Sequence, residues 1–292
     1  MKLLREEDQN YVFLSPQQAL LEKRSSHPLF SIEGVSTALV RGDSLHILYS
    51  RGVASHLAGS LIHYLAFFDG TKRQKVNPSQ RINAMFSRIK QLYTERNVTS
   101  RMTNLRLSMI TDPSKPHKNY ACLEAKAAET KHLLPCLLQL IQEALPEEEP
   151  IHETMIGCLT AFIEIQDLYD AIGMFPSPAE YGQACSLAKR FFDSYHDLHQ
   201  WALLKGRKLF HVTFKFHSFK HLVLNSKYLN FRAHHNFRAE HFVGQISVLS
   251  HSCSFGVKTS KLCSKVNQKY KFLLHLQITR PGFGQGNETM DP

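Results

Sequence analysis

The chain has 292 residues, of which 43% are hydrophobic and 21% charged, and its formal net charge is +10. This composition excludes a disordered chain and predicts a folded protein of one large domain or two ordinary ones. No apolar run approaches the ~20 residues of a membrane span, and the charged N-terminus has no apolar signal core, so we expect an intracellular protein outside the membrane.

The predicted elements are mainly helices. Up to residue 116 we expect a short helix over 12–24, a buried strand over 35–49 broken at Gly42, a helix over 53–68, an amphipathic helix over 79–96 opened by Pro78, and a loop over 111–116. Further helices are expected over 120–145, 151–172, about 178–204, 214–230, 236–250 and 259–276, followed by a disordered tail over 281–292. The fold class is therefore mainly α with a small β component.

The basic charge lies in the last third of the chain. Residues 201–292 contain 14 Lys and Arg against three acids, a net charge of +11, so residues 1–200 sum to −1. Basic segments of this kind are typical of contacts with a nucleic-acid backbone, although lysine stripes also form ordinary solvated helix faces. The candidate nucleic-acid-binding residues are Lys215, Lys220, Arg232, Arg238, Lys258, Lys261, Lys265 and Lys269.

Two carboxylates are the candidate catalytic and metal-binding residues. Asp43 follows an apolar segment and precedes a helix, a position typical of a metal ligand and equally of a helix N-cap or turn residue. Glu240 is the only acid between Asp197 and Glu288; it either pairs with a nearby base such as Arg238 or faces Asp43. Carboxylates at such a site favour Mg²⁺ or Mn²⁺.

Histidines and cysteines are weaker candidates. His217 and His221 stand four residues apart, a spacing that can bind Zn²⁺, but the His-Glu-x-x-His signature is absent and packed or surface histidines are the preferred interpretation. The six cysteines include no Cys-x-x-Cys pair and are interpreted as free thiols, with a zinc site as the alternative.

Three segments resemble cut-and-paste transposases of the CACTA and related plant and fungal groups. They are Gly42-Asp43-Ser-Leu-His46, the helical region over 124–135, and the pair formed by Phe216-His217 and Phe237-Arg-Ala-Glu240-His. The resemblance implies a partial RNase H-like fold over 31–275, with a helical insertion over about 75–210. On either side we expect an N-terminal helix or extension over 1–30 and a disordered tail over 276–292.

The resemblance also implies a function. It makes Asp43 and Glu240 two of three metal-binding carboxylates for DNA cleavage and strand transfer, and it implies a nuclear location. Two features depart from the family: His241 stands where the family has Arg, and the first catalytic Asp has no candidate upstream. We therefore expect a transposase-derived protein that is inactive although Asp43 and Glu240 lie near each other. The alternative is a non-catalytic helical protein that binds nucleic acid or another partner through its basic last third.

Overall fold

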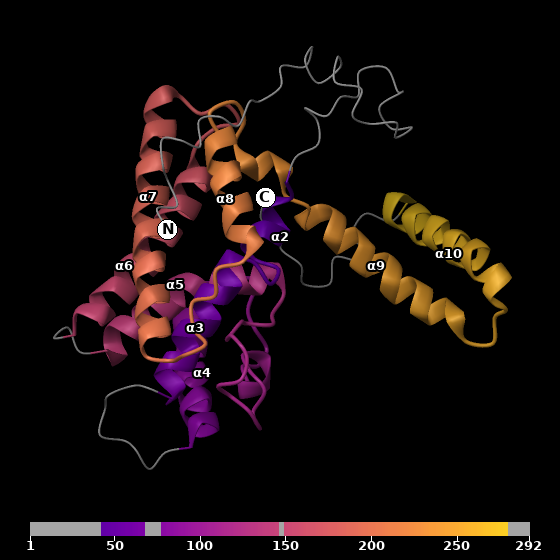
Figure 1. Ribbon diagram of the computed structural model, residues 1–292. Coiled ribbons are helices and arrows are strands. Elements are labelled where there is room, and N and C mark those ends of the chain that lie inside the picture. The colour runs from indigo at the N-terminus through magenta and orange to yellow at the C-terminus, as the bar shows by residue number, and fades with distance from the viewer. Residues whose placement is uncertain (1–41, 68–76, 146–148, 280–292) are drawn as a thin grey trace, which may run out of the picture. The chain divides into compact units, whose positions relative to one another are not determined.

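The computed structural model describes residues 42–67, 77–145 and 149–279 (Figure 1). The mainly α expectation is confirmed, and these ranges contain no β-strand. Contacts between residues divide the chain into two units, Met1–His235 and Asn236–Pro292, which are described separately below.

The first unit is a bundle built around one buried helix. Every residue of α3 except Phe67 is buried, and α3 packs against α2, α4, α5, α6 and α8. The described helices of this unit are α2 (Ser44–Leu48), α3 (Val53–Phe67), α4 (Pro78–Glu95), η4 (Leu107–Met109), α5 (Ala127–Ala144), α6 (Pro150–Ala171), α7 (Pro178–Leu204), α8 (Phe214–Asn225) and η5 (Phe231–His234).

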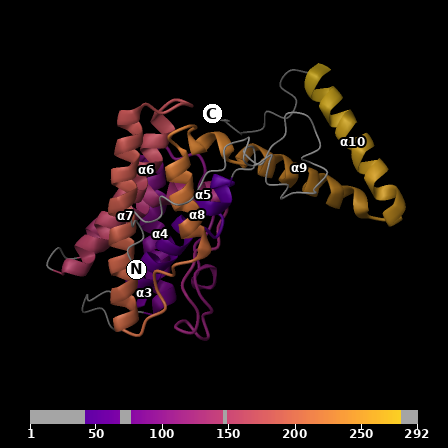
Figure 2. The ribbon, with the colours of Figure 1, turned by 45° about the horizontal axis from the view of Figure 1, so that its top comes forward.

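An aromatic core joins α6, α7 and α8. Figure 2 shows α6 and α7 running alongside each other, and their contact is the most extensive in the unit. The rings of Phe162 and Phe191 lie 5.3 Å apart, and those of Tyr195 and Phe216 lie 4.4 Å apart. All four side chains are almost completely buried, so α8 is held against the bundle by its apolar face.

Helix starts follow the capping signals in the sequence. Asn77 and Ser177 precede Pro78 and Pro178, and each opens a helix with a capping box. At α7 the Ser177 amide donates to Glu180 Oε2 at 2.7 Å, while the Glu180 amide donates to Ser177 Oγ at 3.3 Å. The predicted starts near residues 79 and 178 are therefore confirmed.

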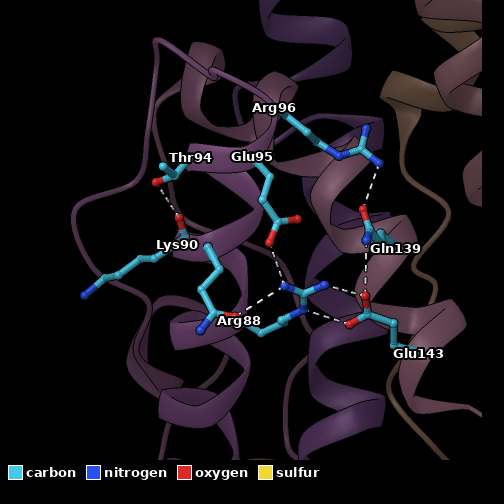
Figure 3. Close-up of polar contacts among 8 residues, drawn as sticks. Arg88, Lys90, Thr94, Glu95, Arg96, Gln139 and Glu143 are labelled. Atoms are coloured by element: carbon cyan, nitrogen blue, oxygen red, sulfur yellow. Dashed lines mark hydrogen bonds and ion pairs between the residues drawn. The ribbon is translucent and has the colours of Figure 1, made fainter.

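A surface ion-pair group links α4 to α5 (Figure 3). Arg88 donates to both carboxylate oxygens of Glu143, at 2.9 and 2.7 Å, and to Glu95 at 3.1 Å. Arg96 reaches Gln139 on the same helix as Glu143. The hydrogen bonds from Arg88 lower the pKa of Glu143, but solvent around these groups keeps their contribution to stability small.

The predicted strand over 35–49 is wrong where the structure describes it, because Ser44–Leu48 form helix α2. Leu45, Leu48 and Tyr49 are all buried. Residues three and four positions apart lie on one face of a helix, so this apolar pattern is compatible with a helix as well as with a strand. Residues 35–41, the predicted helix over 12–24 and the predicted disordered tail over 281–292 lie outside the described ranges.

Two other predicted helices are shorter than expected. The helix predicted over 120–145 begins at Ala127, because the preceding residues form an extended segment with distant backbone partners. Within it, Cys122 N donates to Ile110 O at 3.1 Å and Leu123 N donates to Ser55 O at 2.9 Å. The helix predicted over 214–230 ends at Asn225.

The second unit contains two packed helices, α9 (Phe237–Ser254) and α10 (Thr259–Thr279). Figures 1 and 2 show the two helices side by side, joined by a short turn. Gly256 adopts a φ of +67° in this turn, a conformation that favours glycine. Leu249 and Cys253 of α9 are buried, and the rings of Phe242 and Tyr270 lie 5.8 Å apart.

Candidate nucleic-acid interface

Asp43 is the N-cap of α2. Its backbone is extended, with φ −72° and ψ 110°, and its Oδ1 accepts a hydrogen bond from Leu45 N at 3.0 Å. Its Oδ2 lies 2.5 Å from His46 Nδ1. The N-cap interpretation that the sequence left open is therefore confirmed, while residues 35–41, where the sequence predicts a strand before Asp43, lie outside the described ranges.

Glu240 lies in the first turn of α9, in the second unit. The side chains at 238–241 are outside the described part of the structure, and these include Glu240 and Arg238. Asp43 belongs to the first unit. The proximity of Asp43 and Glu240 therefore stays a prediction.

Of the two carboxylates that the resemblance implies, only Asp43 has a described side chain, so the Mg²⁺ or Mn²⁺ site stays a prediction. Both Asp43 oxygens already contact protein groups, one the Leu45 amide and the other His46. In the described part of the chain, no three His, Cys, Asp or Glu side chains lie together in a way that holds a metal ion. We derive no reaction step through Mg²⁺ or Mn²⁺.

Three of the predicted basic contacts are engaged within the first unit. Lys215 is half-buried and donates to Ser50 O at 2.7 Å, and burial lowers the pKa of its ammonium group. Lys220 is buried in α8, with 8% of its surface exposed. Arg232 donates to Asp170 O at 2.9 Å. These three cations are engaged within the first unit, Lys220 by burial and the half-buried Lys215 and Arg232 by hydrogen bonds to backbone carbonyl groups.

The predicted lysines of the second unit are different, because all of them are exposed. Lys258 precedes α10, and Lys261, Lys265 and Lys269 follow along the helix at intervals of three or four residues. This spacing places them on one helical face, here called the lysine face. Lys269 Nζ donates to Ser252 Oγ of α9 at 2.8 Å, so the end of the lysine face is anchored to the neighbouring helix.

Helix α10 contains no acidic residue. On α7, by contrast, exposed Lys189 forms an ion pair with Asp193, four residues later on the same helix, at 2.5 Å. No carboxylate of the same helix therefore lies beside the α10 lysines, whereas Lys189 has such a partner one turn away.

An exposed aromatic side chain lies on the same face as the lysines, and the sequence interpretation missed it. Phe272 is 60% exposed. It stands 11 residues after Lys261 and seven after Lys265, offsets close to three and two full helical turns. That spacing relative to the lysines is the signal that reveals it in the sequence. A second aromatic, Phe255, is 88% exposed in the turn between α9 and α10.

A separate apolar face of α10 packs against α9. Leu262, Val266 and Tyr270 line an open hollow between the two helices together with Ile246 and Ser250 of α9. Val266 and Tyr270 are rotated away from the lysine face, whereas Leu262, seven residues before Lys269, borders it. The packing of α10 on α9 thus reaches the edge of the lysine face at Lys269 and leaves Lys261 and Lys265 exposed.

Comparisons with protein-family models, with curated proteins and with solved structures find no match to this chain. Across the described ranges, no helix combines the length and the apolar character that a membrane span requires.

Proposed function

We propose that this chain binds nucleic acid, most naturally DNA, through the lysine face of α10. The observation that carries the proposal is the row Lys261, Lys265 and Lys269, exposed on one face of a helix that contains no acidic residue, with exposed Lys258 directly before the helix. Lysines in such a row contact successive phosphates and release the counterions condensed around them. Contacts of this kind position a protein on nucleic acid without reading its sequence.

Phe272 supports a preference for single strands. Aromatic side chains beside a row of cations stack on unpaired bases, and every base offers a face for this contact. In duplex DNA the bases are already stacked on one another, so an exposed phenylalanine gains little there. Binding should therefore be sequence-tolerant and stronger for a single strand than for a duplex of equal length.

The test compares two triple variants of the full chain in fluorescence anisotropy with a labelled 20-nucleotide single strand and the matching duplex. The first variant is Lys258, Lys261 and Lys265→Gln, and its matched control is Lys115, Lys118 and Lys126→Gln on the exposed surface of the first unit. Both variants lose three positive charges. The first should lose most of its affinity for both DNA forms, whereas the control should keep it; equal losses would show that net charge alone is responsible.

Phe272→Ala tests the stacking step. Loss of a stacking contact weakens single-strand binding by about 1–3 kcal/mol. Duplex binding, which depends on the lysines, should stay nearly constant. An equal loss on both DNA forms would contradict stacking and indicate damage to α10 itself, which circular dichroism of the variant would reveal.

We further propose that the chain descends from the C-terminal part of a transposase with a partial RNase H-like fold, and that it no longer cleaves DNA. The motifs around Asp43 and Glu240 support the descent, and the engagement of both Asp43 oxygens by Leu45 N and His46 supports the loss of activity. A nuclear location follows from such a descent. Robust nicking of labelled DNA with Mg²⁺ or Mn²⁺, lost in Asp43→Asn and Glu240→Gln, would overturn the loss of activity.

A further inference from the structure

Two histidines converge on the surface of α8, in the first unit. Nε2 of His217 and Nε2 of His221 lie 2.9 Å apart, and the two rings are nearly perpendicular, with an interplanar angle of 81°. His217 is exposed and His221 is half-buried. The two nitrogens that point toward each other are the atoms with which imidazole most often binds transition metals.

The helix that carries this pair is rigidly held. Its opposite face, which includes Phe216, Phe219, Leu222 and Val223, is buried in the bundle. The pair therefore stands on a packed helix and not on a loop, and the helix fixes the backbone positions from which the two side chains extend. Fixed donor atoms bind a metal ion with little reorganisation.

The separation is that of a hydrogen bond between the two imidazoles, in which one Nε2–H donates to the other Nε2. A metal ion that binds both nitrogens takes the place of that proton. Metal-to-imidazole bonds are about 2.05 Å long, so two nitrogens at neighbouring corners of a square or an octahedron lie about 2.9 Å apart, whereas two corners of a tetrahedron lie about 3.3 Å apart. The pair is therefore already at the separation of the 90° arrangement, which Ni²⁺ and Cu²⁺ favour.

We propose that His217 and His221 form a two-histidine chelate for a divalent transition-metal ion of square or octahedral preference, with its remaining positions filled by water or by a donor from a ligand. The chelate uses none of the residues of the lysine face and neither of the carboxylates Asp43 and Glu240. A bound ion links two side chains that lie one turn apart on α8. It stabilises the folded first unit because the unfolded chain, in which the two imidazoles have no fixed separation, binds the ion more weakly.

The test is titration of the full chain with Ni²⁺, followed by calorimetry and by the thermal unfolding midpoint. The wild type should bind one equivalent and unfold at a higher temperature with Ni²⁺ than without it. His217→Ala and His221→Ala should each weaken Ni²⁺ binding at least about tenfold. Substitution of a residue that only hydrogen-bonds to a metal ligand already lowers metal affinity by about that factor. His196→Ala, which removes a half-buried histidine on α7, should bind Ni²⁺ as the wild type does.

Three results would overturn the proposal. The wild type could fail to bind Ni²⁺, or the variants at 217 and 221 could bind Ni²⁺ as tightly as the wild type. His196→Ala could also lose as much Ni²⁺ affinity as those variants. A thiolate-to-nickel absorption band would assign the ion to a cysteine, such as exposed Cys263, and would also refute it. The unfolding midpoint without metal shows whether each variant is folded, and His217→Gln and His221→Gln replace any alanine variant that is not.

Discussion

Asp43 holds the first turn of α2 with both oxygens of its carboxylate, through the Leu45 amide and His46. An aspartate in this arrangement is explained by helix capping alone. At the residue scale, the capping role of Asp43 is expected to stabilise the folded first unit.

Asp43→Ala should lower the free energy of unfolding by about 0.5–2 kcal/mol, the usual effect of removing an N-cap side chain. Asp43→Asn should retain most of that stability, because an amide oxygen can still accept from Leu45 N. Urea denaturation of the three proteins measures the difference. If alanine and asparagine destabilise equally, the negative charge beside His46 matters more than the cap.

Buried histidines make the first unit sensitive to acid. His63 is 2% exposed and donates from Nε2 to Pro116 O at 3.0 Å, and His56 is 9% exposed. Burial lowers the pKa of each to about 4, with neighbouring His117 and Arg207 adding to the effect at His63, and His211 and Lys215 at His56. The neutral form is therefore the folded form of both side chains.

The folded pKa of about 4 lies below the ordinary value of 6.5, so between these values the unfolded chain binds more protons. Stability should be complete above pH 6.5 and fall as the pH drops toward 4, by at most about 1.4 kcal/mol per pH unit for each histidine. His63→Gln, which keeps a donor for Pro116 O, should make the fall less steep. Unfolding free energies from pH 8 to 4.5 measure this, and an unchanged slope in His63→Gln would contradict it.

At the element scale, α3 depends on a close backbone approach. A Cβ atom added at Gly59 would lie 2.6 Å from Leu123 N and 2.7 Å from the Cys122 carbonyl carbon. These backbone atoms cannot withdraw easily, because Leu123 N donates to Ser55 O of the same helix. Glycine is therefore required here by packing.

Gly59→Ala should lower the free energy of unfolding by about 1–3 kcal/mol, although alanine is the better helix former. Gly157, on α6, provides a matched control because nothing lies within 4 Å of the Cβ position there. Gly157→Ala should raise stability by about 0.5–1 kcal/mol. Opposite signs for the two substitutions in thermal or urea unfolding are the expected result, and a gain at both would show that the Leu123 segment can move away.

The elements differ in how far the sequence predicts them. The starts of α4 and α7 are predictable because Asn77-Pro78 and Ser177-Pro178 are local signals. The start of α5 at Ala127 is not, because Cys122 and Leu123 are held extended by the backbone of Ile110 and Ser55, far away in the sequence. A local sequence pattern does not reveal hydrogen-bond partners that are distant in the sequence. The helix-forming residues before Ala127 are therefore assigned to the helix when the sequence alone is read.

The candidate site shows the same limit. The spacing of Lys261, Lys265 and Lys269 predicts a shared helical face, and the structure has all three exposed on α10. The burial of Lys220 arises from the packing of α8 against the bundle, which no spacing rule reveals. Counting basic residues in the sequence therefore overstates how much of that charge faces solvent.

At the scale of the whole molecule, the basic last third is divided between two units with different roles. Lys215, Lys220 and Arg232 are engaged in the packing of the helical bundle. The exposed lysines of α10 belong to the second unit. The second unit is therefore the part proposed to contact nucleic acid.

The salt dependence of single-strand binding tests this account most directly. The logarithm of the binding constant falls with the logarithm of salt concentration by about 0.7 for each single-strand phosphate contact. Substitution of Lys258, Lys261 and Lys265 by Gln should reduce this slope by about 2, whereas substitution of Lys115, Lys118 and Lys126 should leave it unchanged. Binding that does not vary with salt, or a slope that changes equally in both variants, would contradict the proposal that the lysine face of α10 binds the phosphate backbone.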